Sequence, residues 1–243
     1  MLIIKALILG AVQGLAEFLP ISSSGHLSLL SNLMGVDLDL SFMIMLHIGT
    51  ILAVFLYFNR EIKKCVSEIP GLFSDIKYNI TGYTGYRGSP TGPEYRKIIS
   101  SPYRKITIMI LVTMIPTVLI ALFIYPVSEI FNKSLLVSGM GLFITGLMLL
   151  IASLSERSGK GPKEARFQDA LLVGLFQGAA AFPGVSRLAM TLSAGFFSGF
   201  TAKFNRLFSF LLFIPTMVGA VVLESFKNDW TAVSIGILHG IFG

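Results

Sequence analysis

The sequence predicts an all-α, polytopic membrane protein that forms a single transmembrane domain over residues 1–243. Of the 243 residues, 53% are hydrophobic and only 13% are charged, which is too apolar a composition for a soluble surface. Several apolar runs approach the roughly 20 residues that a helix needs to cross a bilayer. Alternating strands of about ten residues, as a membrane β-barrel requires, are absent. Helices are then the only spanning structure that satisfies the backbone hydrogen bonds.

The apolar runs define the expected spans in chain order. Five apolar runs are separated from one another by polar segments: Leu40 to Phe58, Ile106 to Tyr125, Leu135 to Leu154, Leu207 to Leu223 and Thr231 to Phe242. The first four are long enough to cross the membrane. The fifth is short for a span and ends with the chain, so we expect the last helix of the fold to be missing.

A polar motif occurs twice inside this apolar sequence. The first copy runs from Gly10 to His26 and the second from Gly174 to Thr191. Each contains G-x-x-Q-G, then a Phe and a Pro, then a Ser followed by a cationic or titratable side chain. Polar residues are costly in hydrocarbon and therefore indicate a functional site. Two related copies predict a duplicated architecture whose halves meet at that site.

The basic residues predict how the two motif segments enter the membrane. Most of the 19 Lys and Arg residues lie in three segments, 59–105, 157–166 and 203–206. Cytoplasmic loops are enriched in Lys and Arg. All three segments share one face only if Gly10 to Gly35 and Gly174 to Gly199 are re-entrant hairpins, with tips that meet near the midplane. The alternative, in which the motif helices cross fully, stays open.

The hairpins predict an inverted repeat, in which each copy is a re-entrant helix hairpin plus transmembrane helices. Repeat one would cover residues 1–155 and repeat two residues 166–243, with a basic cytoplasmic loop at 59–105. We expect a multi-pass protein of the cell membrane whose basic loops are cytoplasmic.

Helical spacing groups the polar residues of the first motif. Gln13 and Glu17 are four residues apart, as are Gly10 and Gly14, so all four lie on one side of a helix. Carboxylate and amide oxygens are hard ligands suited to Mg²⁺ or Ca²⁺, so Gln13 and Glu17 predict a divalent cation as cofactor. Other glycines, such as Gly141, are expected to serve helix packing.

The residues after each motif proline predict an anion site. Pro20 and Pro183 break the helices, and the serines that follow are good N-cap residues, namely Ser22, Ser23, Ser24 and Ser186. Helix N-termini that face a cavity bind anions through free backbone N–H groups. Arg187 adds a guanidinium fork suited to phosphate oxygens, and Thr191 lies one turn further along the same face.

Glu17, Ser23 and His26 form a plausible set for phosphoryl transfer beside that anion site. A structural ion pair between Glu17 and Arg187 is the alternative interpretation. His47 opens an apolar span, and we expect it to serve packing, with a role in the site as the less favoured interpretation.

The two motifs carry a resemblance to a known family. Gln13 to His26 match (E/Q)GxxEFLPxSSxGH, and Pro183 to Thr191 match PGxSRSxxT. At these residues the chain resembles the bacitracin-resistance type of undecaprenyl-diphosphatase, integral membrane enzymes that recycle the polyprenyl carrier lipid of cell-wall synthesis. Leu188 departs from the pattern, because the family usually has a second Ser there.

The resemblance implies hydrolysis of a polyprenyl diphosphate to the monophosphate and phosphate, in a cleft open to the outer face. It implies catalytic roles for Glu17, Ser23, His26 and Arg187, substrate binding by Ser22, Gly184, Ser186 and Thr191, and metal binding by Gln13 and Glu17. The expected partners are the diphosphate lipid and membrane lipids. We expect no nucleic-acid partner and leave a homo-oligomer open.

Two other functions stay open from the sequence. Inverted repeats with broken helices are also transporter architecture, so a polyprenyl-phosphate transporter is one alternative. A catalytically weakened lipid-binding relative is the other, and Leu188 is the residue that suggests it.

Overall fold

The computed structural model describes residues 2–36, 40–85, 95–131, 134–155 and 159–227. Within these ranges the chain forms nine helices and no strand beyond one isolated β-bridge, between Lys160 and Phe200. The helices are α1 Leu2–Phe18, α2 Ser23–Met34, α3 Leu40–Tyr57, α4 Asn59–Gly85, α5 Pro102–Phe131, α6 Leu135–Leu154, α7 Phe167–Ala179, α8 Arg187–Phe197 and α9 Ala202–Lys227. The predicted all-α fold class is confirmed.

Three helices are long and apolar enough to cross a membrane alone, at Pro102–Ser128, Leu135–Leu154 and Ala202–Val222. They contain the second, third and fourth predicted runs. The first run corresponds to α3. This helix is long and apolar enough to cross a membrane only when it is taken together with α4, and the two helices meet at a bend of 85°. The fifth predicted run, Thr231 to Phe242, lies outside the described residues.

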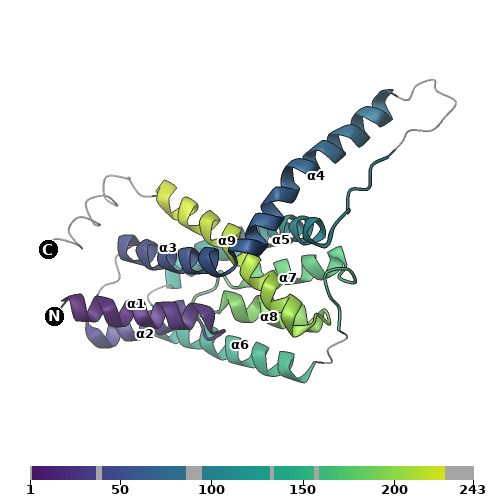
Figure 1. The fold of residues 1–243 in the computed structure, drawn as a ribbon. Helices are drawn as coiled ribbons and strands as arrows, with labels where there is room; N and C mark the ends of the chain where they lie inside the picture. The colour runs from purple at the N-terminus through teal and green to yellow at the C-terminus, as the bar shows by residue number, and fades with distance from the viewer. Residues whose placement is uncertain (1, 37–39, 86–94, 132–133, 156–158, 228–243) are drawn as a thin grey trace.

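The first motif forms a helix hairpin. Helices α1 and α2 lie side by side (Figure 1), and the Lys5 Nζ donates to the Met34 carbonyl over 2.7 Å, so the start of α1 is tied to the end of α2. Pro20 lies in the turn between them, where a missing N–H and a fixed φ stop the helix. Gly35 ends α2 in the left-handed conformation, a common helix terminator.

The second motif forms a second hairpin, from α7 and α8. The Lys160 amide donates to the Gly199 carbonyl and the Thr201 amide donates to the Lys160 carbonyl, both over 2.9 Å, so the segment before α7 is tied to the segment after α8. The open ends of the two hairpins lie at opposite ends of the molecule and their tips meet in its middle (Figure 1). This is the hairpin arrangement that the motifs predict. The pairing of the other helices into complete inverted repeats stays a prediction.

The main core surrounds the second hairpin. Buried side chains of α5, α7, α8 and α9 form one cluster, in which Phe200, Phe204 and Phe208 contact one another. The outer face of α1 is instead exposed, with Ile3 at 76% and Leu7 at 68% of their maximal accessible surface. An apolar surface of this kind on a membrane protein is suited to contact with lipid chains.

The predicted basic segments come together at one end of the molecule. The Lys105 Nζ donates to the Lys163 carbonyl over 2.5 Å, and the Lys64 Nζ lies 3.4 Å from the Tyr103 hydroxyl. The bridge between Lys160 and Phe200 adds the segment that precedes α9. The described parts of all three basic segments therefore share one end, as the charge pattern predicts.

The region predicted as a basic loop, 59–105, differs from that expectation because most of it is helix α4. Buried Ile62 and Cys65 pack into the main core beside Ile106 of α5, at the spacing of three that one helix face requires. The Arg104 guanidinium also binds Glu68 at 2.8 Å and Asp75 at 2.5 Å. The sequence did not predict this helix, because the segment is polar and contains a Pro-Gly pair at residues 70–71, which is typical of a loop.

Candidate active site

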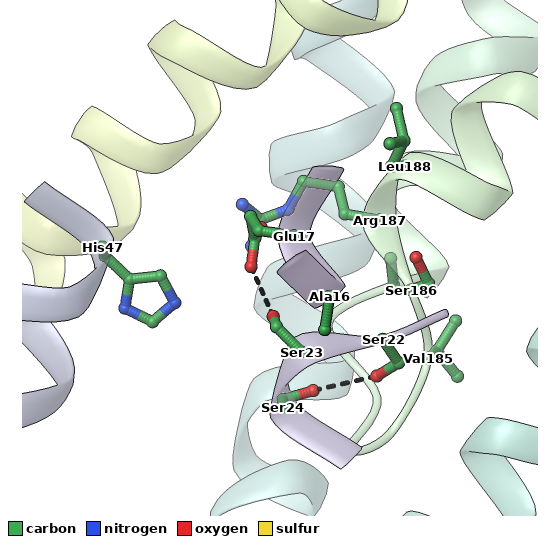
Figure 2. A pocket seen from close by; sticks show the side chains of 11 residues that line it. Ala16, Glu17, Ser22, Ser23, Ser24, His47, Val185, Ser186, Arg187 and Leu188 are labelled. Carbon is green, nitrogen blue, oxygen red and sulfur yellow. Dashed lines mark hydrogen bonds between the residues drawn. The ribbon is translucent and has the colours of Figure 1, made fainter. Parts of the chain in front are cut away.

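A polar pocket of about 70 Å³ lies where the hairpin tips meet (Figure 2). Both motifs and α3 supply its lining, which is Ala16, Glu17, Ser22, Ser23, Ser24, His47, Ala180, Val185, Ser186, Arg187 and Leu188. The predicted meeting of the two motifs at one site is therefore present. Because this volume is that of about two water molecules in the liquid, the pocket accommodates a phosphoryl-sized polar group, and a lipid chain must lie outside it.

Two helix N-termini face this pocket. Ser22 caps α2, with its Oγ accepting from the Gly25 amide at 3.2 Å, and Ser186 caps α8 in the same way from the Ala189 amide at 3.2 Å. Each cap satisfies one of the several free N–H groups of a first helical turn. The remaining N–H groups and the positive ends of both helix dipoles favour an anion at this position.

The turn that precedes α2 has an unusual backbone. Ser22 has φ 70°, and among the described residues it is the only non-glycine residue with positive φ. Such conformations cost on the order of 1–3 kcal/mol and cluster at functional sites. The Ser22 carbonyl accepts from the His26 amide at 3.3 Å and lies 2.8 Å from the His26 Nδ1. These contacts hold the turn in the shape that places Ser23 against Glu17.

The turn that precedes α8 packs closely on α6. Gly184 has φ +80°, and a Cβ there would collide with the Ser138 carbonyl, just as a Cβ at Gly141 would collide with the Pro183 carbonyl. The Ser186 amide donates to the Thr145 Oγ1 of α6 over 2.9 Å. Gly184 is not among the pocket-lining residues, and its structural effect is to let this turn approach α6. The packing role predicted for Gly139, Gly141 and Gly146 is confirmed for Gly141, whereas a Cβ at Gly139 or Gly146 would meet no heavy atom of another segment within 4 Å.

The carboxylate of Glu17 is the acceptor at the centre of the first motif. Both the Ser23 hydroxyl and the Gln13 Nε2 donate to its Oε2, the latter over 3.0 Å. Arg187 reaches toward Glu17 from the opposite hairpin (Figure 2), and its guanidinium also contacts the sulfur of Met217 on α9. A carboxylate that already accepts a hydrogen bond from a hydroxyl is placed to act as its base.

Four predicted site residues do not line the pocket, namely Gly184, Gln13, His26 and Thr191. The His26 ring lies against the Ser22 carbonyl. Thr191 is 2% exposed, and its hydroxyl donates to the carbonyls of Arg187 and Leu188 at 3.2 and 3.1 Å. The structure thus places His26 in the first turn of α2 and Thr191 one turn after Arg187 in α8, where they support the residues that do line the pocket.

His47 lines the pocket, although its place in an apolar run predicts a packing role. Its ring projects from α3 toward the tips of the hairpins (Figure 2), and the charges of Glu17 and Arg187 both act on it. The less favoured interpretation therefore fits the structure better. His47 lies 21 residues beyond the end of the first motif, and as a polar residue inside an apolar run it indicates a site by the same argument as the motifs.

Leu188 forms an apolar part of the pocket wall and is 7% exposed. Ser24, which also lines the pocket, lies with its Oγ 3.3 Å from the Ser22 Oγ. The hydroxyls of the pocket are therefore concentrated on the first hairpin.

The predicted divalent-cation site can be tested against its donors. Among the described residues no group of three or more His, Cys, Asp or Glu side chains is arranged to hold a metal. The Gln13 Oε1, however, is buried without a hydrogen-bond partner one turn from Glu17. Mg²⁺ usually binds to one or two carboxylates plus substrate phosphates. The donors fit such a cation only in part, because Glu17 lines the pocket and Gln13 does not.

Comparison with known proteins agrees with the motifs. The model of the family described as bacitracin resistance protein BacA matches residues 6–242. The undecaprenyl-diphosphatase of Alkaliphilus metalliredigens is 38% identical over 234 residues, which cover 96% of this chain and 79% of that protein. That of Methanosphaera stadtmanae is 36% identical, covering 91% and 76%. Undecaprenyl-diphosphatase 4 of Bacillus thuringiensis is 33% identical, covering 98% and 83%. With its two motifs joined in one pocket and its family match almost end to end, the chain belongs to the bacitracin resistance protein BacA family.

Proposed function

We propose that this protein is an undecaprenyl-diphosphate phosphatase of the membrane. It hydrolyses the terminal anhydride of a polyprenyl diphosphate and releases inorganic phosphate, so that the lipid monophosphate can serve again as a carrier for the cell envelope. The observation that carries the proposal is that two capped helix N-termini, Arg187 and the Glu17–Ser23 pair share one pocket. The names of the similar proteins support the same substrate.

The positive groups of the pocket bind and orient the terminal phosphoryl group. The Arg187 fork matches two phosphate oxygens, and the first turns of α2 and α8 offer backbone N–H donors. Phosphoryl transfer depends mainly on positioning and on stabilising charge at the oxygens. These groups therefore supply most of the catalytic effect in this proposal.

Ser23 is the proposed nucleophile and Glu17 its base. The Ser23 Oγ attacks the terminal phosphorus, its proton passes to the Glu17 carboxylate, and the bond to the bridging oxygen breaks with its electron pair on the leaving monophosphate. Water then attacks the phosphoserine, phosphate leaves, and the Glu17 proton returns to the Ser23 Oγ. His47 faces the same space and would hydrogen-bond the leaving oxygen.

Gln13 and Glu17 are the proposed ligands of a divalent cation. When bound, such a cation would neutralise negative charge on the phosphate oxygens. The orphaned Gln13 Oε1 supports this assignment. Chelation should abolish phosphate release, and Mg²⁺ or Ca²⁺ should restore it. Full activity in excess chelator would contradict the assignment.

We also propose that the basic end of the molecule faces the cytoplasm, since Lys and Arg are retained there, and that the pocket opens to the outer face. Single cysteines on a Cys65→Ser background test this topology. Asn32→Cys, at the open end of the first hairpin, should react with an impermeant thiol reagent in intact cells. Lys163→Cys, at the basic end, should react only after permeabilisation. Labelling with the opposite sidedness would reverse the orientation.

The central experiment is phosphate release by the purified protein from a polyprenyl diphosphate in detergent. We expect turnover by the wild type and a phosphorylated protein during turnover with substrate labelled in its terminal phosphate. Ser23→Ala should lose both signals while retaining the fold. Hydrolysis by a folded Ser23→Ala variant would instead assign the attack to water with Glu17 as base. Lipid binding without any phosphate release by the wild type would contradict the proposed function.

A further inference from the structure

A second and much larger groove lies outside the active-site pocket. It has a volume of about 730 Å³, and its lining comes from the tip of α1, the junction of α3 and α4, and the first half of α9: Phe18, Ala53, Tyr57, Phe58, Glu61, Lys203, Arg206, Leu207 and Phe210. The 85° bend between α3 and α4 makes the two helices diverge beside α9. Its volume lies within the roughly 300–1,000 Å³ that small-molecule sites occupy.

One end of the groove is cationic. Lys203 and Arg206 lie three residues apart on α9, so both occupy one face of the helix at the basic end of the molecule. Among the described residues no ion pair involves either of them, and the pairs formed by Arg96, Arg104 and Lys160 lie elsewhere. Glu61 is the only acid in the lining, so the charged groups at this end sum to a net positive charge.

The rest of the groove is apolar and aromatic. The Phe210 ring stacks on Phe58 with centroids 5.3 Å apart and lies 6.0 Å from the Phe18 ring, while Tyr57 is 81% exposed. Lys203 and Phe210 are seven residues apart on α9, which is about 10 Å along a helix axis. The groove therefore leads from cations at the membrane boundary to aromatic rings deeper in the bilayer.

We propose that this groove binds an anionic phospholipid of the bilayer, a ligand distinct from the substrate of the active site. The headgroup phosphate binds Lys203 and Arg206, and one acyl chain lies along Tyr57, Phe58 and Phe210 toward Phe18. Basic pockets between transmembrane helices commonly bind anionic headgroups, and the two cations lie at the depth of bulk phospholipid headgroups. Because Phe18 follows Glu17, the bound chain braces the tip of α1.

Lipid binding by the purified full-length chain in detergent tests the proposal without any substrate. Native mass spectrometry with phosphatidylglycerol, compared with phosphatidylcholine of the same chains, measures both affinities. We expect phosphatidylglycerol to bind about tenfold more tightly, as charge-assisted hydrogen bonds to two cations imply. The double change Lys203→Gln with Arg206→Gln should remove this preference, whereas Glu61→Gln should strengthen it.

A matched control removes two cations from the same protein outside the groove. Lys63 and Lys77 are exposed lysines of α4 that do not line it, so Lys63→Gln with Lys77→Gln should leave the affinity within about twofold. Tyr57→Ala should weaken binding of both lipids by removing apolar contact, and the fold should tolerate it because the ring is exposed.

Three results would overturn the proposal: equal affinity of the wild type for the two lipids, equal losses in the groove and control variants, or weakening by Tyr57→Ala alone. The last would indicate a groove that takes an apolar chain without a phosphate.

Thermal unfolding gives a second measurement, since a ligand that binds only the folded state raises the unfolding temperature. Phosphatidylglycerol should raise it more than phosphatidylcholine does in the wild type and the control, and no more than phosphatidylcholine in the double variant of Lys203 and Arg206.

Discussion

The two hairpins share a motif, yet they occupy different surroundings. In the second hairpin a Cβ at Gly174 would collide with the Thr113 carbonyl of α5, and a Cβ at Gly178 would meet Ile120. In the first hairpin the equivalent Gly10 has only Leu46 nearby, at 3.6 Å, and Gly14 has no heavy atom of another segment within 4 Å. The second hairpin is thus built into the core, whereas the first lies against it.

This difference matches a division of chemistry between the two copies. The first hairpin supplies Glu17 and the hydroxyl of Ser23, whereas the second has Ala181 where the first has Glu17 and supplies Arg187. The proposed phosphate-binding cation is therefore held by the closely packed copy. The proposed base and nucleophile come from the loosely packed copy, whose outer face is apolar and exposed. The two copies thus supply two helix N-termini to one pocket but differ in charge, with Glu17 at the end of α1 and Arg187 at the start of α8.

Glu17→Gln should have the largest effect on activity. The change keeps the shape of the side chain and removes the carboxylate that accepts from Ser23, so phosphate release should fall by about 10³-fold or more. The unfolding temperature in detergent should stay near that of the wild type. Glu164→Gln, in the segment before α7, serves as a control with normal activity.

The opposite outcome would support a purely structural role for Glu17. If the carboxylate served only to neutralise Arg187, its loss would leave a buried charge unpaired and destabilise the fold by roughly 3–5 kcal/mol. The Glu17→Gln variant would then unfold at a lower temperature, while its folded fraction would keep normal turnover. Glu17 of the first hairpin would in that case have no catalytic role.

Arg187→Lys should have the next largest effect, although it keeps the charge. An ammonium group cannot reproduce the bidentate grip of a guanidinium on phosphate, and loss of one oriented donor to the transition state typically costs about 10²–10³ in rate. Arg60→Lys, on the exposed surface of α4, should change the rate little. Near-wild-type turnover by a folded Arg187→Lys variant would remove the phosphate-binding role of the second hairpin.

The sequence was sufficient for those features that depend on local pattern. Apolar runs predicted α5, α6 and α9, and the duplicated motif together with the distribution of Lys and Arg predicted both hairpins and the convergence of Glu17 with Arg187. It was insufficient for His47, which reaches the pocket through the packing of α3 and lies outside both copies of the repeated motif. It also missed helix α4, whose apolar face is masked in the sequence by charged residues that find partners only in the folded state, such as Glu68 with Arg104.

Alanine at paired glycines should sharpen the contrast in packing. Gly174→Ala and Gly178→Ala should destabilise the fold by roughly 1–3 kcal/mol, because each Cβ has no room against α5. Gly14→Ala should be neutral or stabilising by about 0.5–1 kcal/mol, because alanine favours the helix and the Cβ meets open space. Unfolding of the purified variants in denaturant measures both. Equal losses in the two hairpins would contradict the difference in packing.

The smallest effect concerns Leu188, the one apolar side chain at a position where the resemblance predicts a second serine. Leu188→Ser places a hydroxyl in the pocket wall on the side of the second hairpin, which otherwise contributes the single hydroxyl of Ser186. One hydrogen bond to phosphate is worth about 1 kcal/mol, so turnover should rise about fivefold. Because Leu188 is 7% exposed, the change also removes packing and should lower stability, and Leu188→Ala is the matched control that loses the packing without gaining a hydroxyl. A ratio near one between the turnover of the Ser and Ala variants would show that the second hairpin binds phosphate through Arg187 and its backbone amides alone.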